Sequence, residues 1–172
     1  STTANITARE LTVSGITATD RVYDSGVVAT ALLVKGSAVL VGKQGSDDVV
    51  LSTTNATATF ADKNVGSNKP ITIAGITISG ADAGNYILTQ PSTTASITAK
   101  TLTVSGITAS NKTYDSLLAA TISGGVISAI SGDTVTLNTS GRAGVFADKN
   151  VGTAKSVTVN GYTISGADAA NY

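Results

Sequence analysis

One segment of the sequence occurs twice and carries residue types that could bind a metal ion. It reads FADKNVG at residues 60–66 and again at 146–152, with an aspartate, an asparagine and a glycine at alternate positions. This D-x-N-x-G spacing begins the calcium loop of an EF-hand, in which oxygen ligands alternate along the chain. An EF-hand also needs a bidentate acid at its twelfth position, where this chain has Ile73 and Val159. The EF-hand form is therefore excluded.

A calcium site of another form and a simple turn both remain compatible with this segment. A second repeated block, ISGADAxNY, supplies further aspartates that could add oxygen ligands. In the simpler alternative, each aspartate accepts backbone N–H groups in its own Asx turn. We expect no resident cofactor, and calcium is the open alternative. The candidate ligands are Asp62, Asn64 and Asp82 in the first copy and Asp148, Asn150 and Asp168 in the second.

Four of the five tyrosines occupy equivalent positions in the two copies. Tyr23 and Tyr114 each begin a Tyr-Asp-Ser triplet, whereas Tyr86 and Tyr172 each end the ISGADAxNY block. A large ring that bears a hydroxyl is usually buried with that hydroxyl hydrogen-bonded. The triplet aspartates, Asp24 and Asp115, are expected to accept N–H groups in their own turns. These residues are thus structural motif positions rather than a ligand platform.

The two copies differ in length at one place. The first copy has five more residues, which fall between Gly26 and Ser46, around Val34–Lys43. A segment that tolerates insertion is expected to be an exposed loop or hairpin tip. By letter matching, Asp47-Asp48 aligns with Gly132-Asp133 and predicts a solvated turn. The candidate binding residues of this variable region are Lys35, Lys43, Asp47 and Asp48.

Composition excludes most catalytic chemistry. The 172 residues include no Cys, His, Met or Trp, so thiolate nucleophiles, imidazole bases and zinc fingers are absent. Eleven basic and eleven acidic residues give a formal charge of zero, which offers nucleic acid no electrostatic hold. Every apolar run is far shorter than the ~18 residues of a membrane span. We expect no enzymatic activity, no nucleic-acid partner and no membrane insertion.

A long internal repeat sets the domain organisation. Residues 1–25 match residues 92–116 with an offset of 91, and FADKNVG and ISGADAxNY recur with an offset of 86. This period has the size of a small independent domain and exceeds the ~20 to 50 residues of a solenoid unit. The sequence predicts the tail of a preceding repeat at 1–7, a first repeat domain at 8–98 and a second at 99–172.

Alternation of aliphatic residues with threonine predicts an all-β fold. It is explicit in Leu11-Thr-Val13, Ile71-Thr-Ile73 and Leu102-Thr-Val104, and glycines punctuate the short strands. We expect six to eight strands per copy, in two tandem small β-sandwich or β-grasp-like domains. Residues 93–104 alternate without Gly or Pro. This run predicts a strand that passes almost directly into the next domain as a short, stiff linker.

The second copy stops at Tyr172, whereas the first continues past Tyr86 into a further strand. A sheet that lacks its closing strand has an unpaired edge. Residues 1–7 match the end of the first copy, so they could pair with that edge in a neighbouring molecule. Head-to-tail strand pairing between copies is therefore one expected partner interaction.

The ordered blocks Tyr-Asp-Ser, FADKNVG and SGADAxNY resemble the YDG-type repeat of long bacterial filamentous-haemagglutinin-like adhesins, and more loosely the MBG surface repeats. The resemblance spans essentially the whole chain. It implies a secreted, multi-repeat adhesin displayed on the bacterial cell surface. Ser25 and Ser116 stand where that family often has glycine.

The resulting expectation is a structural stalk or fibre module, which extends and spaces an adhesive region. Its expected partners are neighbouring repeats of the same chain. The alternative function is a ligand-binding module that contacts host carbohydrate or protein through the variable segments, Val27–Ser46 and Leu117–Ser131.

Overall fold

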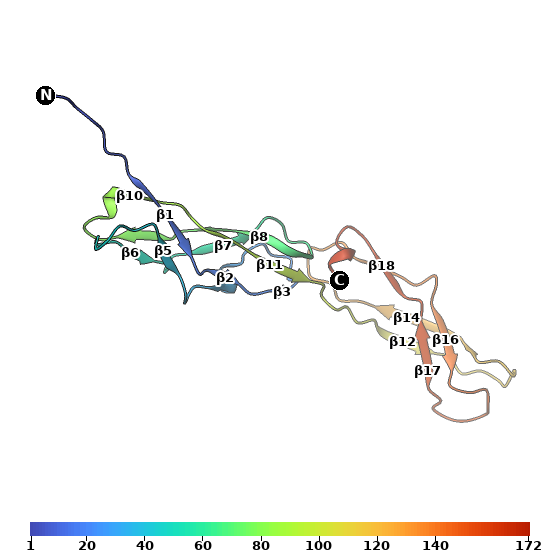
Figure 1. The fold of residues 1–172 in the computed structure, drawn as a ribbon. Coiled ribbons are helices and arrows are strands. Elements are labelled where there is room, and N and C mark those ends of the chain that lie inside the picture. Colours follow the sequence, from blue (N-terminus) through green and yellow to red (C-terminus); the bar gives the residue numbers. More distant parts are fainter. The chain divides into compact units, whose positions relative to one another are not determined.

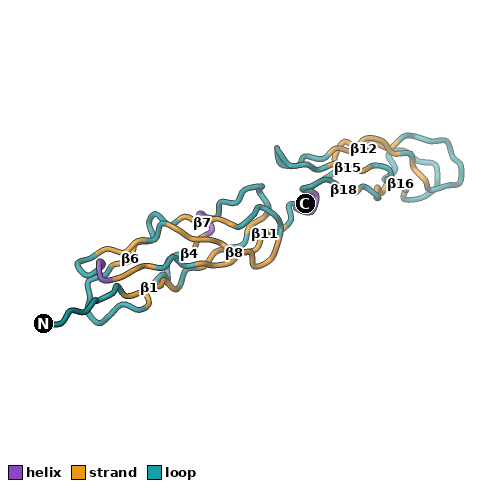
Figure 2. Tube along the Cα trace, turned by 90° about the horizontal axis from the view of Figure 1, so that it is seen from above, coloured by secondary structure: helices purple, strands orange, loops and turns teal.

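A computed structural model describes all 172 residues of the chain. The structure is all-β, and helix is confined to three single turns of 3-10 helix, as Figure 2 shows. Residue contacts divide the chain into two compact units, Ser1–Ala99 (unit 1) and Lys100–Tyr172 (unit 2). The predicted all-β class with two tandem domains is confirmed.

The eleven strands of unit 1 exceed the expected number because several are pairs of residues separated by turns. Its elements are β1 (Arg9–Ser14), β2 (Thr17–Ala18), β3 (Arg21–Val22), η1 (Thr30–Leu32), β4 (Leu33–Val34), β5 (Val39–Val41), β6 (Val50–Ser52), β7 (Thr57–Phe60), β8 (Gly66–Ala74), β9 (Thr77–Ser79), η2 (Ala83–Asn85), β10 (Tyr86–Leu88) and β11 (Ser92–Thr98). Unit 2 contains β12 (Ser105–Ala109), β13 (Ala119–Ala120), β14 (Ile122–Val126), β15 (Thr136–Asn138), β16 (Ala143–Phe146), β17 (Val157–Asn160), β18 (Thr163–Ser165) and η3 (Ala169–Asn171).

The first and last segments of unit 1 run in the same direction along its length. At one end β1 pairs in parallel with β10, with Arg9 opposite Tyr86, in a sheet of order β10-β1-β5. At the other end β11 pairs in parallel with β3, with Thr98 opposite Val22, in a sheet of order β3-β11-β8-β7. The pairs β2-β4 and β6-β9 complete the unit. The chain thus enters unit 1 at one end and leaves it at the other (Figure 1).

Alternate residues of the longer strands form the core of unit 1. Ala58 and Phe60 of β7, Ile71 and Ile73 of β8, and Ile97 of β11 are all buried, whereas their sequence neighbours face outward. This period of two is the pattern expected of a strand with one buried face. Burying one such isoleucine stabilises the fold by roughly 1.5 to 3 kcal/mol relative to exposure.

Unit 2 has a much more open core than unit 1. Its sheets are β12-β14, β13-β16-β17 and β15-β18, and Ile122 is its one buried apolar residue, against fifteen in unit 1. The strand expected at Leu102–Val104 is absent, so that prediction is wrong. In unit 1 the matching residues lie between β10 and β5. The 172-residue sequence has no counterpart of Ile87 and Leu88 after Tyr172, so this segment lacks one partner.

The length difference between the copies has a structural explanation. The turn η1 has no counterpart in unit 2, and the four residues between β4 and β5 are replaced by Gly124-Gly125 within β14. Both glycines have positive φ, and a Cβ on Gly125 would lie 2.7 Å from the ring of Tyr162. The expectation of an exposed loop or hairpin tip at Val34–Lys43 is only partly right, because β5 within it pairs with β1.

Candidate functional site

A cation organises the Tyr-Asp-Ser turn of unit 1. The guanidinium of Arg21 donates from Nη1 to Oδ2 of Asp24 at 3.1 Å and to the carbonyl of Val28 at 2.9 Å, and from Nη2 to the carbonyl of Gly26. It also lies 4.9 Å from the ring centre of Phe60. Asp24 accepts the N–H of Gly26 at 2.9 Å, as expected for an Asx turn. The cation therefore fastens the turn onto the core.

Unit 2 repeats this arrangement with a lysine. The ammonium of Lys112 donates to Oδ1 of Asp115 at 2.8 Å and to the carbonyls of Leu117 and Ala119 at 2.7 and 3.0 Å. Asp115 also accepts the N–H of Leu117 at 2.9 Å, and these two bonds lower the pKa of its carboxyl, the lysine bond most. Sequence reasoning missed both cations. The available signal was a basic residue three positions before the aspartate in each copy.

The FADKNVG segment forms an Asx turn closed by a lysine. Asp62 Oδ1 accepts the N–H of Asn64 at 2.8 Å and the ammonium of Lys69 at 2.7 Å. The bond from Lys69 is the largest cause of the lowered pKa of this carboxyl, followed by the bond from Asn64. The oxygen expected to bind calcium is thus already engaged by a cation of the same chain.

The second copy of the segment has the same arrangement. Asp148 Oδ1 accepts the N–H of Asn150 at 2.8 Å and the ammonium of Lys155, which also donates to the carbonyl of Asn150 at 2.8 Å. These bonds lower the pKa of Asp148 as in the first copy, with Lys155 the larger cause. Neither lysine was singled out from the sequence, because each lies seven residues beyond its aspartate.

The ISGADAxNY block of unit 1 forms a second polar cluster. The hydroxyl of Tyr86 donates to Oδ2 of Asp47 at 2.5 Å and accepts the N–H of Gln44 at 3.0 Å. The bond to the Asp47 carboxylate raises the pKa of Tyr86. Asp82 Oδ2 accepts the N–H of Asp48 at 2.8 Å, and Asp48 Oδ2 accepts the N–H of Ala81 at 3.0 Å.

The same cluster in unit 2 corrects the alignment made from letters. Tyr172 donates to Oδ2 of Asp133 at 2.7 Å and accepts the N–H of Ile130 at 2.8 Å. Asp168 Oδ2 accepts the N–H of Thr134 at 2.8 Å. Asp133 and Thr134 therefore correspond to Asp47 and Asp48, in place of the predicted Gly132-Asp133, because the offset of 86 already holds there.

The candidate binding residues of the variable region all make bonds within unit 1. Lys35 donates to the carbonyl of Thr53 at 3.1 Å, and Lys43 donates to the carbonyl of Asp47 at 3.0 Å. Asp47 and Asp48 belong to the cluster around Tyr86. The structure brings Lys43, Asp47 and Asp48 into one region, but they fasten turns there and form no shared pocket.

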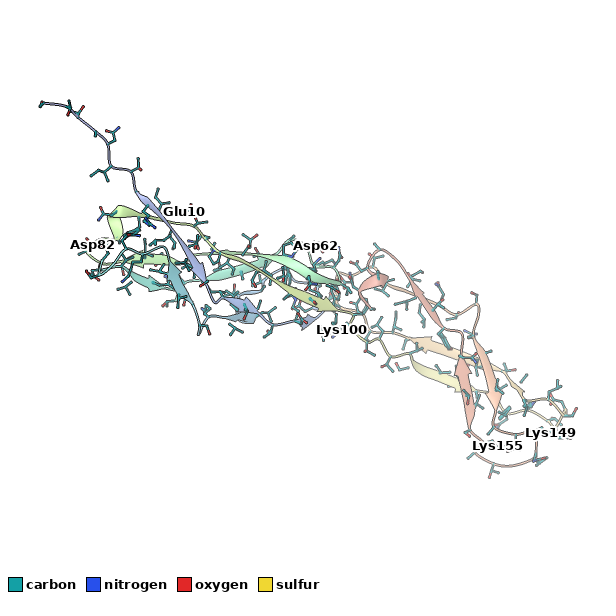
Figure 3. The ribbon with its side chains drawn as sticks, viewed as in Figure 1. Glu10, Asp62, Asp82, Lys100, Lys149 and Lys155 are labelled. Atoms are coloured by element: carbon teal, nitrogen blue, oxygen red, sulfur yellow. The ribbon has the colours of Figure 1, made fainter.

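The candidate calcium ligands of unit 1 are not brought together. Asp62 and Asp82 lie at opposite ends of the unit in Figure 3. No group of three or more acidic, His or Cys residues in the chain is arranged to hold a metal ion. A site that combines the two repeated blocks therefore has no geometric basis in unit 1, and calcium binding elsewhere stays a prediction.

The largest cavity in the chain is a groove of about 620 Å³ in unit 2. It is lined by residues 109–114 and 148–155, with Phe146 and Val157. The groove contains the lysines that fasten both turns, and its walls are largely backbone and short polar side chains. Lys149 and Lys155 mark this end of unit 2 in Figure 3. No helix of the structure is long and apolar enough to cross a membrane.

Comparison with known proteins agrees with the repeat seen in the sequence and in the structure. The family model of the YDG domain matches the chain twice, at residues 7–95 and at residues 98–172. No curated protein and no solved structure matches the chain. The two matches together cover nearly the whole sequence, and each contains one set of the turns described above. The chain therefore belongs to the YDG domain family, of which it carries two consecutive copies.

Proposed function

We propose that this chain is a structural repeat module of a secreted bacterial surface adhesin, which extends and spaces the adhesive region. The carrying observation is the path through unit 1, which enters beside Tyr86 and leaves beside Val22 at the opposite end. Domains whose ends are far apart add length with every repeat. The nine-residue strand β8 alone gives about 30 Å of extent at ~3.3 Å per residue.

The use of the repeated polar residues supports the same role. Asp24, Asp62 and Asp82 each accept backbone N–H groups in or between turns, and two of them also hold a cation. Groups used in this way fix loop shape and are not available to bind a ligand. A spacer needs fixed loops, because a loosely held unit would shorten and bend under load.

The direction of the terminal strands supports resistance to pulling. Tension applied through the chain pulls β1 and β11 toward opposite ends of unit 1. The hydrogen bonds that hold these strands lie across the direction of pull, so they share the load instead of opening one after another. A module selected to transmit force between cell and adhesive region is expected to have this arrangement.

Single-pair fluorescence energy transfer tests the spacer role. The chain has no cysteine, so Gly36→Cys and Ser140→Cys introduce the only two labelling sites, both at exposed turn positions. A spacer predicts one narrow distribution of transfer efficiency. A variant with eight Gly-Ser residues inserted between Ala99 and Lys100 is the flexible control, and it should broaden the distribution.

A distribution in the parent protein as broad as that of the flexible control would contradict the spacer role. Binding of the 172-residue chain to a host glycan or protein, lost on Lys35→Ala or Lys43→Ala, would favour the alternative function. Those two side chains bond only backbone carbonyls, so their removal leaves the strands of unit 1 paired.

A further inference from the structure

The groove of unit 2 occupies the position that β11 fills in unit 1. In unit 1, β11 lies between β3 and β8, with Ile97 opposite both Arg21 and Gly66. The residues equivalent to β3 and to the first half of β8 are 112–113 and 152–156. These residues line the two sides of the groove.

The secondary structure of unit 2 is missing just where it would depend on such a strand. β8 spans nine residues, but its counterpart β17 spans only Val157–Asn160, the part that pairs with β16. The counterpart of β3 is not a strand. β17 is accordingly an edge of its sheet, whereas β8 lies between two neighbours. An unpaired edge presents N–H and C=O groups that favour addition of another strand.

Side-chain exposure marks the same gap. Tyr23 is 1% exposed in unit 1, where its N–H donates to the carbonyl of Thr98 at 2.9 Å. The equivalent Tyr114 is 57% exposed and lines the groove. Val151, also in the groove wall, is largely exposed. A strand with one apolar face would remove these side chains from water.

Residues 1–7 have the sequence that this groove requires. They read STTANIT, and β11 reads STTASIT, so the two differ only at Asn5 and its counterpart Ser96. Ile97 of β11 is 1% exposed, whereas the equivalent Ile6 is fully exposed. The first residues extend away from the sheets of unit 1 in Figure 1. The chain thus carries both an empty strand position and a copy of the strand that fills it.

We propose that residues 1–7 of a second copy of this chain bind in the groove of unit 2 as an added β-strand. The register follows from unit 1: Thr3 lies opposite Ser156, as Thr94 lies opposite Pro70, and Ile6 lies opposite Gly152. The strand is antiparallel to residues 152–158 and parallel to Lys112-Thr113, and Ile6 packs toward Tyr114. This mode of recognition is β-augmentation, in which the backbone gives affinity and the side-chain pattern gives specificity.

The donor strand and the groove belong to different parts of the chain, so the contact is heterologous. Such contacts build open chains of molecules unless their rotation closes a ring. Each molecule receives a strand in unit 2 and donates one from its first residues. The inference is independent of the spacer role, because single-molecule energy transfer is measured at concentrations where copies do not associate.

Sedimentation of the full chain over a range of concentration tests the contact. We expect concentration-dependent association, which Ile6→Asp weakens at least about tenfold, because it replaces the buried side chain of the donor strand. Thr3→Asp is the matched control: it adds the same charge in the same segment, at the counterpart of exposed Thr94. Ile6 is fully exposed in the isolated chain, so neither variant alters the fold of unit 1.

A cysteine pair tests the register. Thr3→Cys with Ser156→Cys places two thiols directly across the expected strand pair, and oxidised glutathione should link separate chains through them. Thr3→Cys with Thr158→Cys displaces the partner by two residues, beyond disulfide reach, and should give far less linkage. Monomeric sedimentation at all concentrations, equal association of Ile6→Asp and Thr3→Asp, or equal linkage of the two pairs would each overturn the proposal.

Discussion

Replacement of Arg21 by alanine is expected to destabilise unit 1 strongly. The side chain is mostly buried, and its guanidinium makes two bonds to backbone carbonyls and packs over Phe60. Hydrogen bonds from a charged group contribute about 1.5 to 3 kcal/mol each. The cation–π contact adds about 0.5 to 2 kcal/mol, and the ion pair with the exposed Asp24 adds about 0 to 1 kcal/mol.

These contributions are not additive, because the released carbonyls regain water and the turn relaxes. We therefore expect Arg21→Ala to lower the free energy of unfolding of unit 1 by about 3 kcal/mol. Arg21→Lys is the matched control, since Lys112 makes the same kinds of bond in unit 2 and lies 5.4 Å from the ring centre of Phe146. Its expected cost is under about 1.5 kcal/mol.

Guanidinium chloride unfolding followed by far-ultraviolet circular dichroism measures both values. The two units are expected to unfold in separate transitions, and the change should fall on the more stable one, because unit 1 contains nearly all of the buried apolar residues. A loss below about 1 kcal/mol for Arg21→Ala, or equal losses for the alanine and lysine variants, would refute the assignment of this cation as the anchor of the turn.

Three further predictions follow from the turns. The lowered pKa values of Asp62, Asp115 and Asp148 mean that these carboxyls stabilise the fold above the unfolded value near 3.8 and lose that contribution as pH falls through the lowered folded values, so Lys69→Met should reduce the acid sensitivity of unit 1 in unfolding curves at pH 5 and pH 3; equal sensitivity in the variant would contradict this. Ser25 has a φ of +64°, a conformation that favours glycine, so Ser25→Gly should raise the unfolding free energy by about 0.5 to 1 kcal/mol, whereas Ser46→Gly at an ordinary φ should not; the thermal midpoint checks both. Excess calcium and chelator should give the same thermal midpoint, because Lys69 and Lys155 already hold the aspartates of the repeated turn; a calcium-dependent rise of several degrees would show that the ion displaces them.

Local chemistry could be predicted from the sequence where the partner lies nearby in the chain. The Asx turns at Asp62 and Asp148 follow from an aspartate two residues before the N–H that it accepts. Alternation predicted the buried faces of β1, β7, β8 and β11 for the same reason, since a strand's period is a local property.

Partners far apart in the chain could not be predicted in this way. The bond from Tyr86 to Asp47 joins residues 39 positions apart, and only the constant offset of 86 hinted that Asp47 and Asp133 are equivalent. The segment Leu102–Val104 alternates as well as Leu11–Val13, yet it forms no strand. Alternation indicates that a residue can join a sheet, but a strand also needs a neighbour to pair with.

The most direct test of the spacer role is the force needed to unfold unit 1 in single-molecule pulling. Attachment at the two termini of the chain loads β1 and β11 along their length, whereas attachment at Gly36→Cys and Thr54→Cys loads unit 1 at positions away from these strands. The spacer role predicts a clearly higher unfolding force for unit 1 with terminal attachment. An equal or lower force through the termini would contradict it, because unit 1 would then have no special resistance along the path that a stalk must hold.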